Sequence, residues 1–217
     1  MAKFERLIPL FGVDGLAKLS KATVCIVGLG GVGGEAAICL ARCGVGNLII
    51  CDFDVVEDTN INRQVVANTK TIGLYKTDCL ESMILDINPK CNVTKLTKRV
   101  DLDLFDLKFD FLIDAIDDID SKTKVIKECV TRRIPLISSM GAAKKIDPTK
   151  VVVTKLSKTT YDPVAKVLRS RLRGYNFPCV SSTEEPVCST LGSYMVVVNT
   201  FSLLLSDYCI KYILKKE

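Results

Sequence analysis

A glycine-rich segment of the chain has the composition of a phosphate-binding loop. Its glycines are Gly28, Gly30, Gly31 and Gly33, between an apolar, β-branched run at residues 23–28 and a helical pattern at residues 32–43. Glycines let the backbone turn tightly and approach a phosphate, and a helix N-terminus supplies free N–H groups and a positive dipole end. We therefore expect these glycines to contact a nucleotide. A plain tight turn is the alternative.

Two acids end the next predicted strand, at residues 47–52. Asp52 follows Gly28 by 24 positions, and Asp54 comes two residues later. A carboxylate at this place in a β-α-β unit is suited to bind ribose hydroxyls. NAD and ATP satisfy the glycines and Asp52 equally well, so these residues alone leave both open.

A polar cluster downstream favours a triphosphate. Asn60, Arg63 and Gln64 lie close together in a predicted loop, and Lys76 stands at the start of a predicted helix. Arg makes bidentate contacts with phosphate oxygens. A cation at a helix N-terminus opposes the helix dipole, so we expect Lys76 to serve a phosphate. A solvated surface lysine is the alternative.

Three acids follow a predicted strand at residues 109–114. Asp114, Asp117 and Asp118 lie at its carboxyl end. Mg²⁺ prefers carboxylate and phosphate oxygens, and we expect Asp117 to bind it. Asp118 or Asp120 is expected to cap the following helix.

The chain has no histidine and ten cysteines. Catalysis must therefore rely on carboxylates, Lys, Arg, Cys or the substrate. No Cys-x-x-Cys pair is present, which makes a four-cysteine zinc site improbable, and a reducing, cytoplasmic setting fits best. Cys179 is predicted to lie in a polar loop. A thiolate there could accept an acyl group, with an incidental structural role as the alternative.

The predicted elements alternate as in a doubly wound parallel sheet. Helices are expected at residues 13–20, 32–43, 75–87, 120–132, 163–173 and 191–213, and strands at 23–28, 47–52, 92–97, 109–114, 135–140 and 151–156. Residues 175–190 are expected to form a loop. The apolar segment 191–213 contains polar interruptions, so we expect a buried helix rather than a membrane span. Peripheral membrane association through it stays open.

The segment after Gly141 is basic. Residues 144–173 carry nine Lys or Arg against two Asp. Such clusters bind nucleic-acid phosphates without sequence preference. The candidates for this role are Lys144, Lys145, Lys155, Lys158, Lys166, Arg169, Arg171 and Arg173; ordinary solvated surface is the alternative.

These motifs together resemble the adenylating enzymes related to ubiquitin activators. The resemblance implies that Gly31 lies against the phosphates of ATP, that Asp52 holds the ribose, and that Arg63, Lys76 and Asp117 serve the phosphates and Mg²⁺. Residues 4–12 resemble the family's opening motif, whose Arg reaches the ATP of the other subunit. Arg6 matches that Arg, which implies a homodimer, while Pro9 stands where a second Arg is often found.

Within this superfamily the chain resembles the tRNA threonylcarbamoyladenosine dehydratases. The similarity lies in residues 138–142, 146–149, 158–159 and 162–169. It implies that ATP adenylates the threonylcarbamoyl carboxylate of an adenosine next to the anticodon, at tRNA position 37. Cyclisation to a hydantoin-type base then releases AMP, after pyrophosphate. A structural monovalent cation and a sulfur-relay protein partner are also left open.

The fold expected is α/β, a Rossmann-like doubly wound, mostly parallel sheet with a C-terminal antiparallel extension and helix. We expect one domain over residues 1–217, with an ATP-binding core at 1–141 and a substrate-side extension at 142–217. Three other functions stay open: adenylation of a small sulfur-carrier protein, an NAD-dependent oxidoreductase, and a non-catalytic scaffold. The oxidoreductase would leave Asn60, Arg63, Lys76 and Asp117 without a role.

Overall fold

The computed structural model describes residues 2–215, with side chains from Lys3 onward. Seven strands form one sheet in the order β3-β2-β1-β4-β5-β7-β6. All neighbouring strands pair in parallel except β6 and β7, which are antiparallel. The strands are β1 (Thr23–Val27), β2 (Asn47–Cys51), β3 (Asn92–Leu96), β4 (Phe111–Asp114), β5 (Leu136–Ser139), β6 (Val151–Lys155) and β7 (Pro178–Ser182). The predicted doubly wound, mostly parallel sheet with an antiparallel extension is confirmed.

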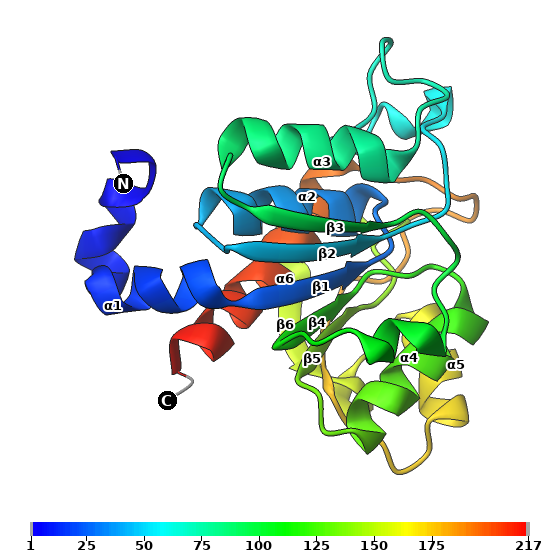
Figure 1. Ribbon diagram of the computed structural model, residues 1–217. Helices are drawn as coiled ribbons and strands as arrows, with labels where there is room; N and C mark the ends of the chain where they lie inside the picture. The colour runs from blue at the N-terminus through cyan, green and yellow to red at the C-terminus, as the bar shows by residue number, and fades with distance from the viewer. Residues whose placement is uncertain (1, 216–217) are drawn as a thin grey trace.

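Helices cover both faces of this sheet (Figure 1). One core lies under α2 (Gly31–Arg42), α3 (Lys76–Ile87) and α6 (Met195–Lys215), and a second lies under α4 (Ile119–Thr131) and α5 (Pro163–Arg171). The central strands β1, β2 and β4 bury side chains on both faces, which explains why they read as apolar runs rather than as alternating patterns. The remaining helices are α1 (Ile8–Lys21) and the 3₁₀ segments η1 (Ala2–Leu7), η2 (Asp58–Asn60), η3 (Leu102–Asp106), η4 (Pro148–Lys150) and η5 (Leu156–Lys158).

The expected loop at residues 175–190 is wrong in part, because it contains β7. This strand inserts between β5 and β6 and is buried over most of its length. Its second half consists of Ser181 and Ser182, which hid the apolar pattern of a buried strand. Ser181 Oγ donates to the buried Asp162 carboxylate, so the hydroxyl is satisfied inside the fold.

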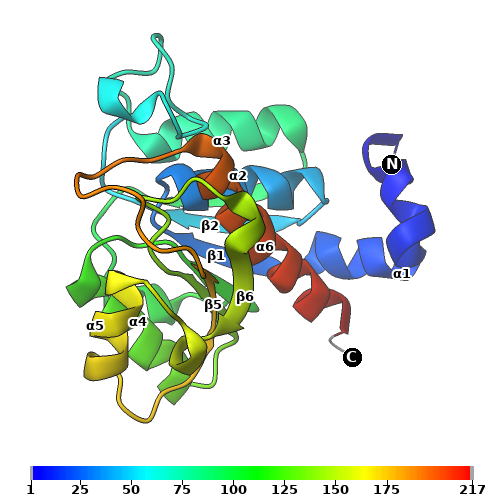
Figure 2. The same cartoon turned by 180° about the vertical axis from the view of Figure 1, so that it is seen from behind.

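The C-terminal helix α6 crosses one face of the sheet beside α2 (Figure 2). Val197, Phe201 and Leu205 are buried there, as the sequence predicted. The hydroxyls of Ser202 and Ser206 bond to carbonyls one turn earlier in α6, at 3.1 and 2.9 Å. Within residues 2–215, α6 is the one helix long and apolar enough to cross a membrane, but half of that stretch is buried in the fold.

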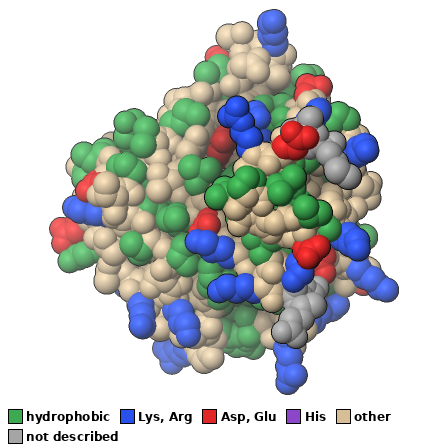
Figure 3. Space-filling view, turned by 90° about the vertical axis from the view of Figure 1, so that its left-hand side faces the viewer, with side chains coloured by type: hydrophobic (Ala, Val, Ile, Leu, Met, Phe, Trp, Pro, Cys, Tyr) green, Lys and Arg blue, Asp and Glu red, His purple; other side chains and the backbone are tan. Residues whose placement is uncertain are grey.

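The N-terminal arm projects from the body of the molecule (Figure 1). Here α1 begins at Ile8, earlier than the predicted 13–20, and it bends at Gly12, where φ is +71°. Leu10 and Val13 are 73% and 68% exposed. The view toward this side shows apolar side chains lying open among lysines and arginines (Figure 3). The arm therefore presents an unusual amount of apolar surface to solvent.

Candidate nucleotide-binding site

A cavity of about 400 Å³ opens at the carboxyl ends of β1, β2 and β4. The strand order reverses between β1 and β4, and ligands of open α/β sheets bind at such a switch point. The cavity is lined by Gly28, Cys51, Asp52, Phe53, Asp54, Lys98, Arg99, Val100, Ile116, Asp117, Asp118 and Ser121. Four of these were predicted site residues: Gly28, Asp52, Asp54 and Asp117.

At three positions of the glycine loop, the surrounding atoms leave room only for glycine. Gly28 has a φ of +84°, and a Cβ there would lie 2.5 Å from the Ala115 carbonyl oxygen. A Cβ on Gly33 would lie 1.8 Å from the Gly28 oxygen, and one on Gly31 would lie 2.9 Å from the Arg63 oxygen. These contacts leave no room for a side chain.

Gly30 differs from its neighbours, because nothing comes closer than 4.0 Å to the place of a Cβ. It is the N-cap of α2, and no side chain caps the helix. The first N–H groups of α2 therefore stay available to an anion, and the space that a side chain would fill beside Gly30 is left open. This geometry fits a phosphate.

Asp52 joins the glycine loop to the end of β2. The carboxylate is buried, and its Oδ2 accepts the Leu29 N–H at 2.6 Å while Oδ1 accepts the Asp54 N–H at 2.8 Å. Each oxygen keeps a further acceptor site, and the residue lines the cavity. The carboxylate can therefore shape the loop and still accept bonds from hydroxyls.

Asp54 and Lys76 form an ion pair with 2.7 Å between Nζ and Oδ2. Lys76 is 5% exposed, whereas the Asp54 side chain is 45% exposed and lines the cavity. The prediction that both residues lie at the site is consistent with this contact. The sequence did not indicate that they pair with each other.

The polar cluster at 60–64 packs around the glycine loop. Asn60 is buried and its Oδ1 accepts the Glu57 N–H, which closes η2. Arg63 Nη1 donates to the Thr59 carbonyl and to Asn62 Oδ1, both at 2.8 Å. Gln64 is 7% exposed, its Nε2 faces Gly30, and its Oε1 has no partner within the described part of the chain. A buried amide with an unsatisfied atom beside the loop fits a site completed by a ligand.

The three acids at the carboxyl end of β4 have separate roles. Asp114 is buried and paired with Lys122 at 2.8 Å. Asp118 caps α4, as predicted, and the Ser121 hydroxyl and N–H hold its pKa below the usual value. Asp117 is exposed in the cavity wall. Between residues 2 and 215 no three His, Cys, Asp or Glu side chains come together as a metal site, so protein groups alone do not form one.

Comparison with known proteins agrees with this geometry. The sequence matches the ThiF family over residues 4–217. The chain belongs to the ThiF family.

Its relatives within that family include tRNA threonylcarbamoyladenosine dehydratases. The Bacillus subtilis protein of that name is 46% identical over 175 residues, covering 79% of this chain and 69% of the relative. The Escherichia coli protein is 40% identical over 200 residues, covering 85% and 75%. An adenylyltransferase and sulfurtransferase of Drosophila willistoni is 34% identical over 152 residues, covering 68% of this chain and 33% of the relative.

Solved structures give the same family. The E. coli dehydratase TcdA in complex with ATP superposes with a TM-score of 0.94 at 35% identity, covering 98% of this chain and 93% of that one. The same enzyme has been solved with AMP. E. coli MccB, at 23% identity and a TM-score of 0.70, shares the fold.

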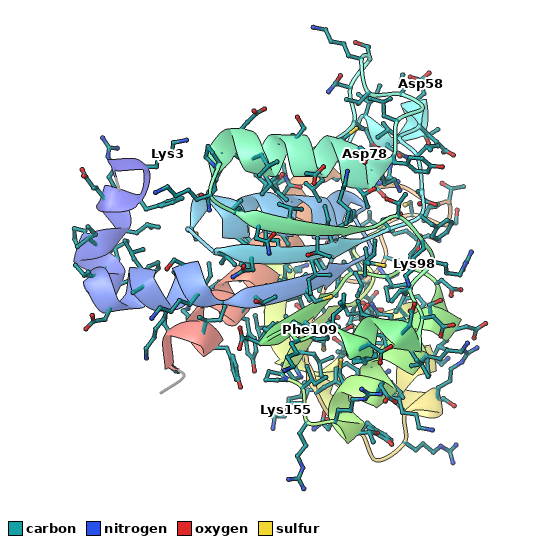
Figure 4. All side chains as sticks on the ribbon, viewed as in Figure 1. Lys3, Asp58, Asp78, Lys98, Phe109 and Lys155 are labelled. Atoms are coloured by element: carbon teal, nitrogen blue, oxygen red, sulfur yellow. The ribbon has the colours of Figure 1, made fainter. Side chains whose placement is uncertain are left out.

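In this ThiF-family chain one wall of the cavity consists of residues that no sequence motif predicted. Lys98, Arg99 and Val100 follow β3 at the same sheet edge, and Figure 4 shows Lys98 there. The Arg99 guanidinium lies 4.5 Å from the centre of the Phe53 ring, and its Nη1 is 3.7 Å from Asp118. The sheet topology could have indicated these residues, because the residues that follow parallel strands lie together at the carboxyl edge of the sheet.

Arg6 lies in the exposed arm. Lys3, three residues earlier, is at the opposite end of the molecule from Lys98 at the cavity (Figure 4). No described residue is recorded as bonding to Arg6, and its side chain is exposed. Within one protomer the arm therefore keeps Arg6 away from the nucleotide cavity.

Cys179 does not lie in a polar loop, and that prediction is wrong. It is the second residue of β7, fully buried. Burial, with the nearby Asp162 carboxylate, raises the pKa of its thiol to about 12. A neutral, buried thiol is a poor acyl acceptor, so the structure does not support a catalytic role for Cys179.

The basic residues after Gly141 separate into two groups. Lys145 is buried and donates to the Glu184 and Tyr161 carbonyls, and burial lowers the pKa of its ammonium. This contradicts its prediction as a nucleic-acid contact, because phosphate cannot reach it. Lys144, Arg169 and Arg171 bond to the Ser189 carbonyl, Thr159 and Asp120 respectively. The exposed remainder, for which the described structure records no partner, is Lys155, Lys158, Lys166 and Arg173.

Proposed function

We propose that this protein is an ATP-dependent tRNA threonylcarbamoyladenosine dehydratase. The observation that carries the proposal is the cavity at the β1–β4 switch point, with its glycine loop, Asp52 and Asp117, in a fold that superposes on the E. coli enzyme over 98% of the chain. The B. subtilis and E. coli relatives bear that name. The adenylyltransferase and sulfurtransferase of D. willistoni matches less of the chain at lower identity.

ATP is proposed to bind with its phosphates at Gly30, Gly31 and the start of α2, and its ribose at Asp52. Arg63 and Lys76 would neutralise the triphosphate, and Gln64 would satisfy its free amide oxygen through a bound water or ligand hydroxyl. Asp52, Gln64 and Lys76 are buried, and such surroundings strengthen electrostatic contacts.

The chemistry proposed has two steps. A carboxylate oxygen of the threonylcarbamoyl group attacks the α-phosphorus of ATP, and pyrophosphate leaves. The neighbouring carbamoyl nitrogen then attacks the activated carbonyl carbon and loses its proton, and the C–O bond to AMP breaks. The net change in the base is the loss of one water, and because ring closure is intramolecular it needs little acid–base assistance. This accounts for an enzyme without histidine.

Mg²⁺ is the metal proposed for the site. Asp117 is the exposed acid in the cavity wall, and Mg²⁺ is commonly held by one or two carboxylates together with substrate phosphates. Bound there, the ion would neutralise charge on the triphosphate. A structural monovalent cation remains an expectation of the sequence.

A homodimer is proposed because Arg6 needs one in order to act. The arm carries Arg6 away from its own cavity and exposes Leu10 and Val13, as a dimer contact would require. Size-exclusion chromatography with light scattering tests this, and a monomer at micromolar concentration would contradict it.

The tRNA is proposed to contact the exposed basic residues Lys155, Lys158, Lys166 and Arg173. We place the protein in the cytoplasm, because all ten cysteines are free and α6 packs in the core. A sulfur-relay partner stays a prediction.

The chain is proposed to divide into an ATP-binding core at 1–141 and a substrate-side extension at 142–217. One sheet runs through both parts.

The deciding experiment incubates the protein with ATP, Mg²⁺ and tRNA that carries threonylcarbamoyladenosine. We expect mass spectrometry of the nucleosides to show loss of one water, with equimolar AMP, and a loss about 10²–10³-fold slower with an Asp117→Ala variant. An unchanged base would contradict the proposal. Pyrophosphate exchange that depends on a small carrier protein would favour the sulfur-carrier function. Tight NADH binding without ATP hydrolysis would favour an oxidoreductase.

A further inference from the structure

The turn after β4 is held by a buried ion pair outside the cavity. Lys122 Nζ lies 2.8 Å from Asp114 Oδ2, and their side chains are 1% and 0% exposed. Ser138 Oγ, at the end of β5, donates to the same carboxylate oxygen at 2.6 Å. Each charge therefore has a partner and further hydrogen bonds, as burial demands.

This ion pair forms hydrogen bonds with both the N–H and the carbonyl of Ile116. Asp114 Oδ1 accepts the Ile116 N–H at 3.1 Å, and Lys122 Nζ donates to the Ile116 carbonyl at 3.0 Å. Ile116 and the next residue, Asp117, both line the cavity. The pair thus fixes the peptide unit from which Asp117 projects.

The same turn is in direct contact with the glycine loop. The Ala115 N–H donates to the Val27 carbonyl at 2.8 Å. A Cβ on Gly28 would lie 2.5 Å from the Ala115 oxygen and 2.9 Å from the Ile116 nitrogen, and one on Gly33 would lie 3.2 Å from Ala115 Cβ. A shift of the turn would therefore change the separation between Asp117 and the phosphate-binding backbone.

We propose that Asp114 and Lys122 are positioning residues that hold Asp117 in register with the glycine loop. A buried ion pair is often no more stabilising than apolar residues of the same size, so stability alone is a weak reason for this pair. Its hydrogen bonds all end on the turn, on β5 and on each other. The inference rests on the proposed function, because it assigns the pair to ATP binding and adenylation.

The main variant combines Asp114→Asn with Lys122→Met. Removing Lys122 alone would leave the Asp114 carboxylate buried without a partner and could unfold the protein, whereas the double change removes both charges and keeps an acceptor for the Ile116 N–H. The matched control is Ile126→Ala, which opens a cavity one turn further along α4 and removes no charged or hydrogen-bonding group. Thermal unfolding shows whether the two variants lose similar stability.

The test is a double-mutant cycle with Asp117→Asn, read as the Kd of ATP with Mg²⁺ by calorimetry and as kcat for cyclisation. We expect the paired variant to weaken ATP binding about tenfold in the native background and less than about twofold when Asp117 is already changed, since residues that act through one another are not additive. Equal losses in both backgrounds would overturn the inference. So would an equal loss of ATP affinity in Ile126→Ala.

The two claims fail separately. If the native enzyme does not cyclise the tRNA base but the coupling appears in the Kd for ATP, the proposed function fails and the positioning role stands. If the native enzyme cyclises and the losses are additive, the positioning role fails alone.

Discussion

The segments before and after Gly141 differ in how many of their predicted functional residues lie together in the fold. Before Gly141, all predicted residues except Arg6 gather around one cavity and its glycine loop: Gly28, Asp52, Asp54 and Asp117 line the cavity, Lys76 pairs with Asp54, and Arg63 and Gln64 lie beside Gly31 and Gly30. After Gly141, half of the eight predicted basic residues bond to the protein itself. Spacing within a β-α-β unit specifies where a side chain goes, and a local excess of charge does not.

A pair of glycine variants gives the largest effect on the first region. Gly33→Ala places a Cβ 1.8 Å from the Gly28 oxygen, so we expect the loop to shift, ATP binding to become unmeasurable, and stability to fall by about 1–3 kcal/mol or more. Gly30→Ala meets open space and should change stability by less than about 0.5 kcal/mol. It should still weaken ATP binding about tenfold by filling the phosphate's space. Calorimetry and thermal unfolding measure both; normal ATP affinity in Gly30→Ala would remove Gly30 from the site.

Asp117→Ala tests the acid that faces the cavity. We expect kcat/KM for cyclisation to fall about 10²–10³-fold, because charge stabilisation at the reacting phosphate is lost. Stability should change by less than about 0.5 kcal/mol, since the side chain is exposed. Asp120→Ala, three residues along, is the control and should leave kcat unchanged, although it frees Arg171. A rate loss matched by Asp120→Ala would show a general charge effect.

The fold could be predicted largely from the sequence because its central strands β1, β2 and β4 are apolar on both faces and helices alternate with them. What failed has physical causes. β7 replaces apolar residues with Ser181 and Ser182, whose hydroxyls are satisfied inside the fold, so neither composition nor period revealed a strand. Cys179 was misplaced with it. The predicted helix at 13–20 missed the first residues of α1, which begins at Ile8 and bends at Gly12.

The site was predicted where a motif names a residue and its place, and missed where only topology does. Lys98 and Arg99 belong to no motif, and they reach the cavity because β3 ends at its edge. The pairing of Lys76 with Asp54 and of Lys122 with Asp114 depends on side-chain contacts across 22 and 8 residues of chain, which the sequence does not encode in any local pattern. Such contacts become visible only in three dimensions.

Variants of exposed and of buried basic residues after Gly141 test which of them contact tRNA. Lys166→Ala and Arg173→Ala should each raise the KM for tRNA a few-fold and lower the salt dependence of binding by about one unit of slope, if each neutralises one phosphate. Lys145→Met should instead cost about 1–3 kcal/mol of stability, because two buried carbonyls lose their donor. Filter binding across a salt series and thermal unfolding make the distinction. An unchanged salt slope in the double exposed variant would place the tRNA elsewhere.

The smallest effect on turnover is expected from Cys179→Ala, with kcat within about twofold of the native value and about 1 kcal/mol of stability lost to the cavity. The thiol has a further signature in pH. Its pKa is raised to about 12 in the folded protein, while the unfolded chain releases the proton near 8.5. Its contribution is therefore fully present below the unfolded pKa and is lost as the pH rises toward 12, by at most about 1.4 kcal/mol per pH unit. Unfolding between pH 8 and 10 should depend less steeply on pH in the variant, although Cys51 and Cys129, also raised to about 12, keep part of the slope. A hundredfold loss of kcat, or an acyl group trapped on Cys179, would show instead that β7 opens to expose a nucleophile.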